Sequence, residues 1–500
     1  GTYTLMTYGG ANPDTTGLVC ANPVVGKSYT FSSGSGAVTV TIGTDPSTAS
    51  VWNIDGSGSW SGAGNWTLSA PSNGPASVAR LDSVITAPVT VATAGETVGS
   101  IFFNNLSAYT LGGSGLTLDN NAAPALLSVE LGAHTVAAPL TLAGDAVADL
   151  SPATTLRLAA VSGAAATLTA QGNGTLLLTA APAVQSLALN NAEVAFSDAM
   201  TLSTPVELQR AVTVRPAMHT TLTVDAVVSG SGGLIKAGSN TLELVEDNTF
   251  AGPTRIDGGT LAVDSLADGG QPSPIGASPA GPENLLLSTG TLRYTGPSVT
   301  VNRGYTLNPG SKGSSVLFTA NGLTFAGRIQ GTSGALIKTG PGTLSLTYPG
   351  AQTLGVNENT MSAPTLIGPF GDSPTTNFQA LTILNGKVAV GVPGQTNTVG
   401  ARMCVGYYST TAPGAETAGE LEINGGAFTC NSTVSVGRNN GTATTAPGGL
   451  TSRITINGGA VTFNLLALGY NGISGFNGFN ARPACDVNAG SLTINAYCNI

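Results

Sequence analysis

The chain has 500 residues and a formal net charge of −9, with 9% charged residues against about 25% in an average soluble protein. Its 17 basic residues are scattered rather than clustered, which disfavours nucleic-acid binding. No apolar run is long enough to span a membrane, and a hydrophobic content of 41% argues against disorder. The 69 glycines suit short strands joined by tight corners. In such a stacked architecture the length of the chain does not predict the number of domains.

The first 50 residues contain three strand-like runs, at 3–8, 28–31 and 37–42, around a loop rich in Gly, Asn, Pro and Ser. They look like the end of a preceding β module. The chain starts at Gly1, without a Met or a signal peptide. We therefore expect a processed or excised segment.

All three tryptophans follow closely, at Trp52, Trp60 and Trp66. One interpretation is a platform on which sugar rings stack, because a pyranose face packs well on an indole. The other, which we favour, is a hydrophobic cap or junction that closes the end of one module.

From residue 85 to 228, short runs alternate apolar residues with Thr or Ser, the period-2 pattern of strands with one buried face. The two histidines, His134 and His219, lie in this region without nearby His or Cys partners. A metal site is therefore disfavoured, and we expect surface or partly packed histidines.

Residues 229–263 read SGSGGLIKAGSNTLELVEDNTFAGPTRIDGGTLAV, a string of very short runs that end in Gly, Asn or Asp. The order Leu-Ile-Lys-x-Gly-x-x-Thr-Leu-x-Leu recurs at 336–346, 102 residues downstream. Recurrence of a turn-strand unit predicts a repeat architecture. The strands expected here are 234–236, 241–244, 254–256 and 260–263.

This stretch resembles the autotransporter-associated β-strand repeat, also called the passenger-associated transport repeat. The resemblance covers residues 229–263 and, more briefly, 331–346. It implies an all-β fold, a right-handed parallel β-helix or β-solenoid with loop insertions, exported to the cell surface or beyond. It implies no particular activity.

Residues 264–288 are rich in Asp, Gly and Pro and predict a loop between coils, and a second irregular stretch spans 347–378. The chain's one acid-rich window adjoins the first loop, with Arg255 as its only basic residue. Solvated corners explain these acids better than a calcium site does. The acids are Glu243, Glu246, Asp247, Asp257, Asp264 and Asp268.

The last part carries a strand-turn-strand repeat that is marked by an asparagine in each turn. The asparagines are 39, 33 and 31 residues apart, and they are Asn385, Asn424, Asn457 and Asn488. They could stack as an internal hydrogen-bonded ladder or supply the left-handed backbone of a turn, and the glycines that follow favour the turn.

Five cysteines are too few for a disulfide scaffold, and their pairing stays open. Cys430 occupies the position that Phe463 fills in the next repeat, which favours a buried thiol there over a bridge. The others are Cys20, Cys404, Cys485 and Cys498.

These observations divide the chain into four segments. After the module end at 1–50 come a Trp-rich junction with a first solenoid segment (51–263) and a continued solenoid with insertions (264–378). Repeats of about 31–39 residues follow (379–500), and we expect them to be cut within a repeat.

The resulting hypothesis is a non-enzymatic extracellular structural protein without a cofactor, part of a bacterial surface or fibre-forming β-solenoid. Open solenoid ends expose strand edges, so we expect self-association as its partner interaction. The alternative is a surface adhesin or carbohydrate-binding protein that uses Trp52, Trp60 and Trp66. A polysaccharide lyase or hydrolase is less favoured, because it needs clustered carboxylates with a basic partner.

Overall fold

The computed structural model describes most of the chain. The described residues are 2–16, 18, 27–44, 49–69, 72–82, 84–216, 220–307, 314–331, 335–354, 381–400, 402–408, 418–439, 452–468, 483–496 and 498–499. Their regular structure is all strand apart from two 3-10 turns, η1 (Ala63–Asn65) and η2 (Pro282–Asn284).

The chain forms two compact units. The first comprises Gly1–Ser197 with Thr204–Val206, and the second comprises Asp198–Ser203 with Glu207–Ile500.

The first unit begins with a separate antiparallel sheet in the order β1-β3-β2. Its strands are β1 (Thr2–Thr7), β2 (Lys27–Gly34) and β3 (Ala37–Thr44). The three expected strands are therefore present. β2 and β3, which are consecutive in the chain, pair antiparallel, and β1 pairs antiparallel with the other side of β3. Every residue of β1 is exposed, at one edge of this sheet.

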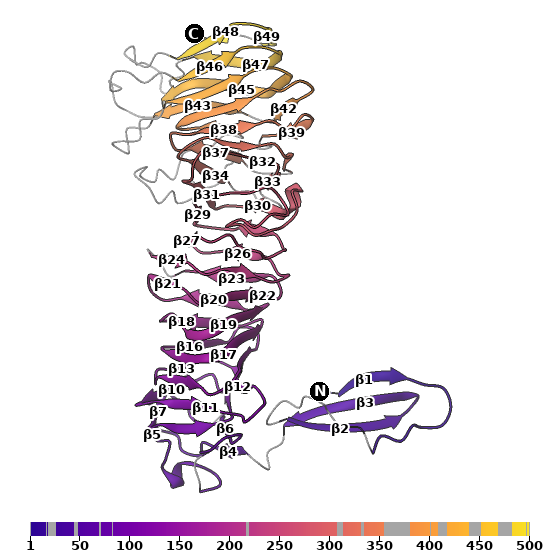
Figure 1. The fold of residues 1–500 in the computed structure, drawn as a ribbon, viewed down its shortest axis with the longest axis vertical. Coiled ribbons are helices and arrows are strands. Elements are labelled where there is room, and N and C mark those ends of the chain that lie inside the picture. Colours follow the sequence, from indigo (N-terminus) through magenta and orange to yellow (C-terminus); the bar gives the residue numbers. More distant parts are fainter. Residues whose placement is uncertain are drawn as a thin grey trace. The chain divides into compact units, whose positions relative to one another are not determined.

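The rest of the first unit is a parallel solenoid, whose successive strands stack in Figure 1. One sheet contains β5 (Gly58–Ser59), β7 (Val89–Thr93), β10 (Tyr109–Gly113), β13 (Ala133–Val136), β16 (Thr155–Leu158), β18 (Thr175–Leu178) and β20 (Glu193–Phe196). Another contains β4 (Ala49–Val51), β6 (Val78–Leu81), β9 (Ser100–Asn104), β12 (Ala125–Leu131), β15 (Ala146–Leu150), β17 (Val161–Gly172) and β19 (Ala183–Asn190). Beside it pair β8 (Glu96–Val98), β11 (Leu116–Leu118) and β14 (Leu140–Leu142).

The second unit repeats this plan. One sheet contains β23 (Val212–Arg215), β26 (Leu234–Lys236), β28 (Thr254–Ile256), β30 (Leu285–Leu287), β33 (Tyr305–Leu307) and β36 (Ile329–Gly331). Another begins with β21 (Met200–Leu202), β24 (Thr221–Val224), β27 (Thr241–Leu244), β29 (Thr260–Val263), β31 (Thr291–Tyr294), β34 (Ser314–Thr319), β37 (Ala335–Thr339), β40 (Leu381–Ile383) and β43 (Met403–Tyr408). It continues through β45 (Ala427–Asn439), β42 (Thr396–Val399), β39 (Ala351–Thr353), β47 (Ala460–Leu468), β49 (Ser491–Ile494) and β50 (Cys498–Asn499).

A third sheet of the second unit contains β32 (Val299–Val301), β35 (Leu323–Phe325), β38 (Thr343–Leu346), β41 (Gly386–Val390), β44 (Gly419–Ile423), β46 (Arg453–Ile456) and β48 (Ala484–Val487). Two further strands are β22 (Val206–Leu208) and β25 (Val228–Ser229).

The core lies inside the coils because alternate strand residues point inward. In the segment β26 to β29, Leu234, Leu242, Ile256 and Leu261 are at most 3% exposed. Full burial of such a side chain stabilises the fold by about 1.5–3 kcal/mol. Each coil obtains that burial only from its neighbours, since Leu242 stacks in register with Leu222 and Leu261.

The parallel β-solenoid predicted from the sequence is confirmed. The four expected strands at 234–236, 241–244, 254–256 and 260–263 coincide with β26, β27, β28 and β29. The second Leu-Ile-Lys copy likewise lies in β37 and β38. Most of the irregular stretch at 347–378 lies outside the described residues.

Candidate functional site

The three tryptophans form a buried cluster at the start of the first solenoid. Trp52, Trp60 and Trp66 are 1%, 0% and 2% exposed. The ring centroid of Trp66 lies 5.3 Å from that of Trp52 and 4.9 Å from that of Trp60, both edge to face. Such aromatic pairs stabilise a fold beyond the area they bury.

Hydrogen bonds fix two of the indoles to the backbone. Trp60 Nε1 donates to Ser72 O at 2.7 Å, and Trp66 Nε1 donates to Trp60 O at 2.6 Å. A buried indole offers no face to a sugar ring. The burial therefore supports the module-cap interpretation over the stacking platform.

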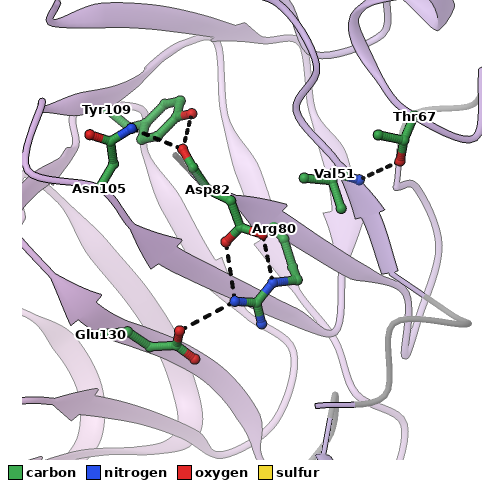
Figure 2. A network of polar contacts seen from close by, with 7 residues as sticks. All are labelled: Val51, Thr67, Arg80, Asp82, Asn105, Tyr109 and Glu130. Carbon is green, nitrogen blue, oxygen red and sulfur yellow. Dashed lines mark hydrogen bonds and ion pairs between the residues drawn. The ribbon is translucent and has the colours of Figure 1, made fainter. Parts of the chain in front are cut away.

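Near this cluster, a partly buried ionic network joins β6 to β12 in the first unit (Figure 2). Arg80 of β6 donates through Nε and Nη2 to the Asp82 carboxylate at 3.0 and 3.1 Å, and through Nη2 to Glu130 of β12 at 3.2 Å. Its guanidinium also lies 5.0 Å from the Phe102 ring centroid. Burial lowers the pKa of Arg80, but its bonds to Asp82 and Glu130 outweigh this and raise the pKa above the usual value.

The same network is anchored to the backbone. Tyr109 Oη and Asn105 Nδ2 both donate to Asp82 O, at 2.7 and 3.0 Å, and on a neighbouring strand Val51 N donates to Thr67 Oγ1 at 3.2 Å (Figure 2). The bonds from Tyr109 and Asn105 tie one coil to the next. We interpret the network as structural.

His134 is a core residue rather than a surface one, since it is 2% exposed. Its Nδ1 accepts from Tyr109 N at 3.1 Å, so its Nε2 donates to Leu131 O at 2.7 Å. Burial lowers the pKa of His134 and keeps the ring neutral. The expectation of a surface or partly packed histidine was wrong here, and His219 lies outside the described residues.

The acids of the acid-rich window make separate local contacts. Thr223 Oγ1 donates to Glu243 Oε2 at 3.0 Å, and Arg255 Nε pairs with Asp257 Oδ1 at 2.5 Å. Asp268 Oδ1 accepts from Asn302 N at 2.7 Å. Among the described residues, no group of three or more His, Cys, Asp or Glu side chains could hold a metal ion.

The loop next to this window is ordered around one buried arginine. Arg303 is 2% exposed and donates to the carbonyl oxygens of Ala267 and Gly276, both at 2.7 Å. It also bonds Ser278 through both O and Oγ at 3.2 Å. The predicted loop after β29 is thus held in one shape by a guanidinium that satisfies its inward carbonyls.

The lysine of each Leu-Ile-Lys copy is also buried, which sequence reasoning missed. Lys236 is 0% exposed, and its Nζ donates to the carbonyl oxygens of Ala237 at 2.8 Å, Gly238 at 3.1 Å and Gly258 at 3.0 Å. Three carbonyls satisfy the three ammonium hydrogens. Burial, with a smaller effect of Arg215, lowers the pKa of Lys236 to about 8.

Lys338 repeats this arrangement in the second copy. It is 0% exposed and donates to the carbonyl oxygens of Thr339 at 2.7 Å, Gly340 at 2.8 Å and Asn385 at 3.2 Å. Burial lowers the pKa of Lys338 to about 7. A signal was present, because each lysine stands two residues after an inward leucine and so shares its face of the strand.

Partly exposed charged side chains form rows on the outer side of β41, β44, β46 and β48. Lys387, Glu420 and Arg453 are register partners on successive strands. Lys387 Nζ lies 2.5 Å from Glu422 Oε2 and 3.4 Å from Glu420 Oε1. In the next strands Arg453 Nε lies 3.3 Å from Asp486 Oδ2.

The hydrogen bond from Lys387 lowers the pKa of Glu422 and raises that of Lys387 itself. Both groups therefore stay charged over a wide pH range. The inward partners on these strands are apolar, as Leu421 and Ile454 are 0% exposed.

The repeat asparagines border these rows. Asn457 Nδ2 donates to Asn424 Oδ1 at 2.9 Å, Asn488 Nδ2 donates to Asn457 Oδ1 at 2.8 Å, and Asn424 Nδ2 donates to Glu422 Oε1 at 2.8 Å. These three asparagines form an exposed ladder, whereas Asn385 accepts from its own neighbour, Gly386 N, at 2.7 Å.

The turn itself differs from the favoured interpretation. The left-handed residues are Gly386, Gly426, Gly459 and Gly490, with φ of 70°, 66°, 88° and 82°, and not the asparagines. Glycine adopts this conformation without the steric cost that a Cβ brings. The asparagines sit at the turns, as expected, but their side chains stack.

We name the outer side of β41, β44, β46 and β48 the polar face. It consists of Lys387, Glu420, Glu422, Arg453, Asp486, Asn424, Asn457 and Asn488. Regular rows of charges and amides can bind a polar macromolecule at several points at once. It is the candidate functional site.

The buried cysteines are structural. Cys430 is register partner to Phe463, as the sequence predicts, and it is a thiol that is 1% exposed. Burial raises the pKa of Cys430 to about 11, which keeps the thiol protonated at neutral pH. Cys404 is also buried, and Cys20 and the side chain of Cys498 lie outside the described residues.

The described strands form a parallel β-solenoid whose coils carry a sequence repeat. The family model described as Passenger-associated-transport-repeat matches residues 234–263, the segment from β26 to β29. This confirms the resemblance read from the sequence.

A curated relative extends the likeness. The chain is 33% identical over 249 residues to the protein named Adhesin BmaC autotransporter from Brucella suis biovar 1 (strain 1330). The match covers 49% of this chain and 7% of that much longer protein. No solved structure matches the chain.

A search of the described residues for a helix long and apolar enough to cross a membrane finds none.

Proposed function

We propose that the chain is a passenger segment of a bacterial surface adhesin, located at the cell surface or outside the cell. The single observation that carries this proposal is the 33% identity over 249 residues to a protein named as an adhesin and autotransporter. The matched repeat at 234–263 supports the same placement.

Within that role, the polar face contacts the partner. Its charged and amide groups are exposed to different degrees, with Arg453 and Asp486 side chains 51% and 45% exposed. The tryptophans, His134 and the two repeat lysines are at most 2% exposed and serve the core instead. We therefore assign the adhesive contact to the polar face rather than to a sugar platform of Trp52, Trp60 and Trp66.

Beads coated with the folded chain test the adhesin function. We expect them to attach to cultured epithelial cells more than beads coated with serum albumin, and soluble chain should compete for attachment. A panel of polysaccharides tested as competitors distinguishes a glycan partner from a protein partner. Attachment no greater than that of albumin beads contradicts the proposal.

A second candidate function, self-association in a surface fibre, rests on β1. This edge strand is exposed along its whole length, and Tyr3, Leu5 and Met6 are 58%, 52% and 59% exposed. An apolar, unpaired edge is a template for another strand. Sedimentation should show concentration-dependent association that Leu5→Lys abolishes, and a monomer at all concentrations contradicts it.

A further inference from the structure

Three asparagines of the chain precede a glycine in the same repeat position, at Asn385, Asn424 and Asn457. An asparagine before glycine can react with its own backbone, because the following nitrogen can reach the side-chain carbonyl carbon with no Cβ in the way. The three share one local sequence type. Their surroundings in the fold differ.

Only Asn385 is folded toward this reaction. Gly386 N donates to Asn385 Oδ1 at 2.7 Å, which holds the carboxamide against the nitrogen that would attack it. Asn424 and Asn457 instead use their carboxamides in the ladder, where Asn457 Nδ2 bonds Asn424 Oδ1 and Asn457 Oδ1 accepts from Asn488. A ladder bond must break before either can turn toward its own glycine.

A buried cation lies on the reacting peptide at Asn385. Lys338 Nζ donates at 3.2 Å to Asn385 O, the carbonyl oxygen of the peptide bond that contains Gly386 N. When that nitrogen loses its proton, negative charge spreads onto this oxygen. A donor already aimed at it stabilises the charge without reorganisation.

The backbone keeps this geometry in place. Gly386 has φ of 70°, and a Cβ there would lie 2.4 Å from both Gly340 O and Gly342 O. The residue therefore must be glycine. Backbone hydrogen bonds from Leu384 N to Lys338 O at 2.9 Å and from Lys387 N to Gly342 O at 3.3 Å hold the turn on the preceding coil. Reacting atoms held close together gain most of their rate from such fixed positioning.

We propose that Asn385–Gly386 is a self-modification site, at which the chain converts Asn385 to aspartate or isoaspartate through a cyclic imide. Hydroxide removes the Gly386 N–H proton, and the nitrogen attacks Asn385 Cγ. The bond from Cγ to Nδ2 breaks, and Nδ2 leaves as ammonia with a proton from water. Water then opens the imide at either carbonyl.

The product carries a carboxylate on the residue whose carbonyl Lys338 already contacts. The conversion thus supplies a negative charge beside a buried ammonium whose three bonds go to carbonyl oxygens. No oxidant or cofactor is required, because amide and water become acid and ammonia.

Peptide mapping of the full chain after incubation at neutral pH, where part of Lys338 still carries its proton, tests the site and reads all three asparagines in one sample. In the folded chain we expect Asn385 to convert on the order of tenfold faster than Asn424 and Asn457. In denaturant the three rates should agree within about twofold, because only the shared dipeptide remains. Equal rates in the folded chain, or slower conversion at Asn385, overturn the proposal.

The part played by the ammonium is tested with Lys338→Met, whose folding is checked by circular dichroism. In a folded variant we expect slower conversion at Asn385 and unchanged rates at Asn424 and Asn457. An unchanged rate at Asn385 overturns the role of Lys338. If the variant unfolds, Lys338→Arg, which keeps the charge, should retain fast conversion, and loss of it overturns the role equally.

Discussion

Lys236 and Lys338 make equivalent hydrogen bonds in the two copies of the repeat. Each Nζ bonds the carbonyls of the next two residues and a third carbonyl on the following coil. Their register partners are Ile256 and Ile383, and the third carbonyl lies two residues beyond each partner. The lysine thus fastens one turn to the turn stacked on it.

Removal of either lysine should destabilise the solenoid. Lys338→Met leaves three inward carbonyls without a donor, and we expect a loss of about 2 kcal/mol in the free energy of unfolding. Lys387→Met is the matched control, because its partly exposed ion pairs contribute about 0–1 kcal/mol. Urea denaturation measures both, and equal effects would contradict the account.

Because these two lysines are buried, we expect the free energy of unfolding to increase above neutral pH. Their pKa values in the fold are about 8 and about 7, against 10.5 for an unperturbed lysine. Between these values the unfolded chain binds more protons than the folded chain, so the free energy of unfolding increases with pH. Below this window the cost of burying the charge is fully present.

Urea midpoints at neutral pH and about two units higher measure this effect. We expect the midpoint of the native chain to increase relative to that of a Lys236→Met, Lys338→Met double variant. The change in the urea midpoint between the two pH values, compared between the native chain and the double variant, isolates the contribution of the two lysines from that of other titrating groups. A relative decrease would mean that the ammonium form is the better fit in the fold.

Arg303 should control the order of the loop after β29. Arg303→Met removes the donor for the carbonyls of Ala267, Gly276 and Ser278, and we expect cleavage of the folded chain between β29 and β30 by a nonspecific protease. Arg255→Met is the control, because that arginine is about half exposed. Mass spectrometry identifies the cleavage sites. If both variants are cleaved at the same sites, other contacts order the loop.

Trp60→Ala should lower stability and leave binding unchanged. The indole is fully buried and packs on Trp66, so its removal opens a cavity that costs about 3–5 kcal/mol. Thermal unfolding gives the stability, and bead attachment of the folded fraction gives the binding. Normal stability with lost attachment would restore the sugar-platform interpretation.

The strands were predictable because period-2 alternation and turn residues are local signals. The alternation gave β26 to β29 their correct bounds, and the repeat of Leu-Ile-Lys indicated stacking. The position of the lysines was missed because a charged side chain is normally assigned to the solvent side. One of the three carbonyls that satisfy each buried ammonium lies on the next coil, far away in the sequence, so the local pattern did not reveal it.

The polar face was less accessible to sequence reasoning. The asparagines were identified as turn positions, but the ladder depends on the register between coils more than 30 residues apart. The ion pairs of Lys387 with Glu420 and Glu422 depend on that register too. For Trp52, Trp60 and Trp66 the sequence favoured a cap over a sugar platform, but an indole fits both roles and only its burial bears on the choice.

The most direct test of the account is attachment of beads that carry charge-reversed variants of the folded chain. Arg453→Glu changes the polar face, and Arg157→Glu makes the same change at an exposed position on β16. We predict that Arg453→Glu reduces attachment to epithelial cells several-fold while Arg157→Glu binds like the native chain. Equal attachment by both variants would contradict the assignment of the polar face as the adhesive surface.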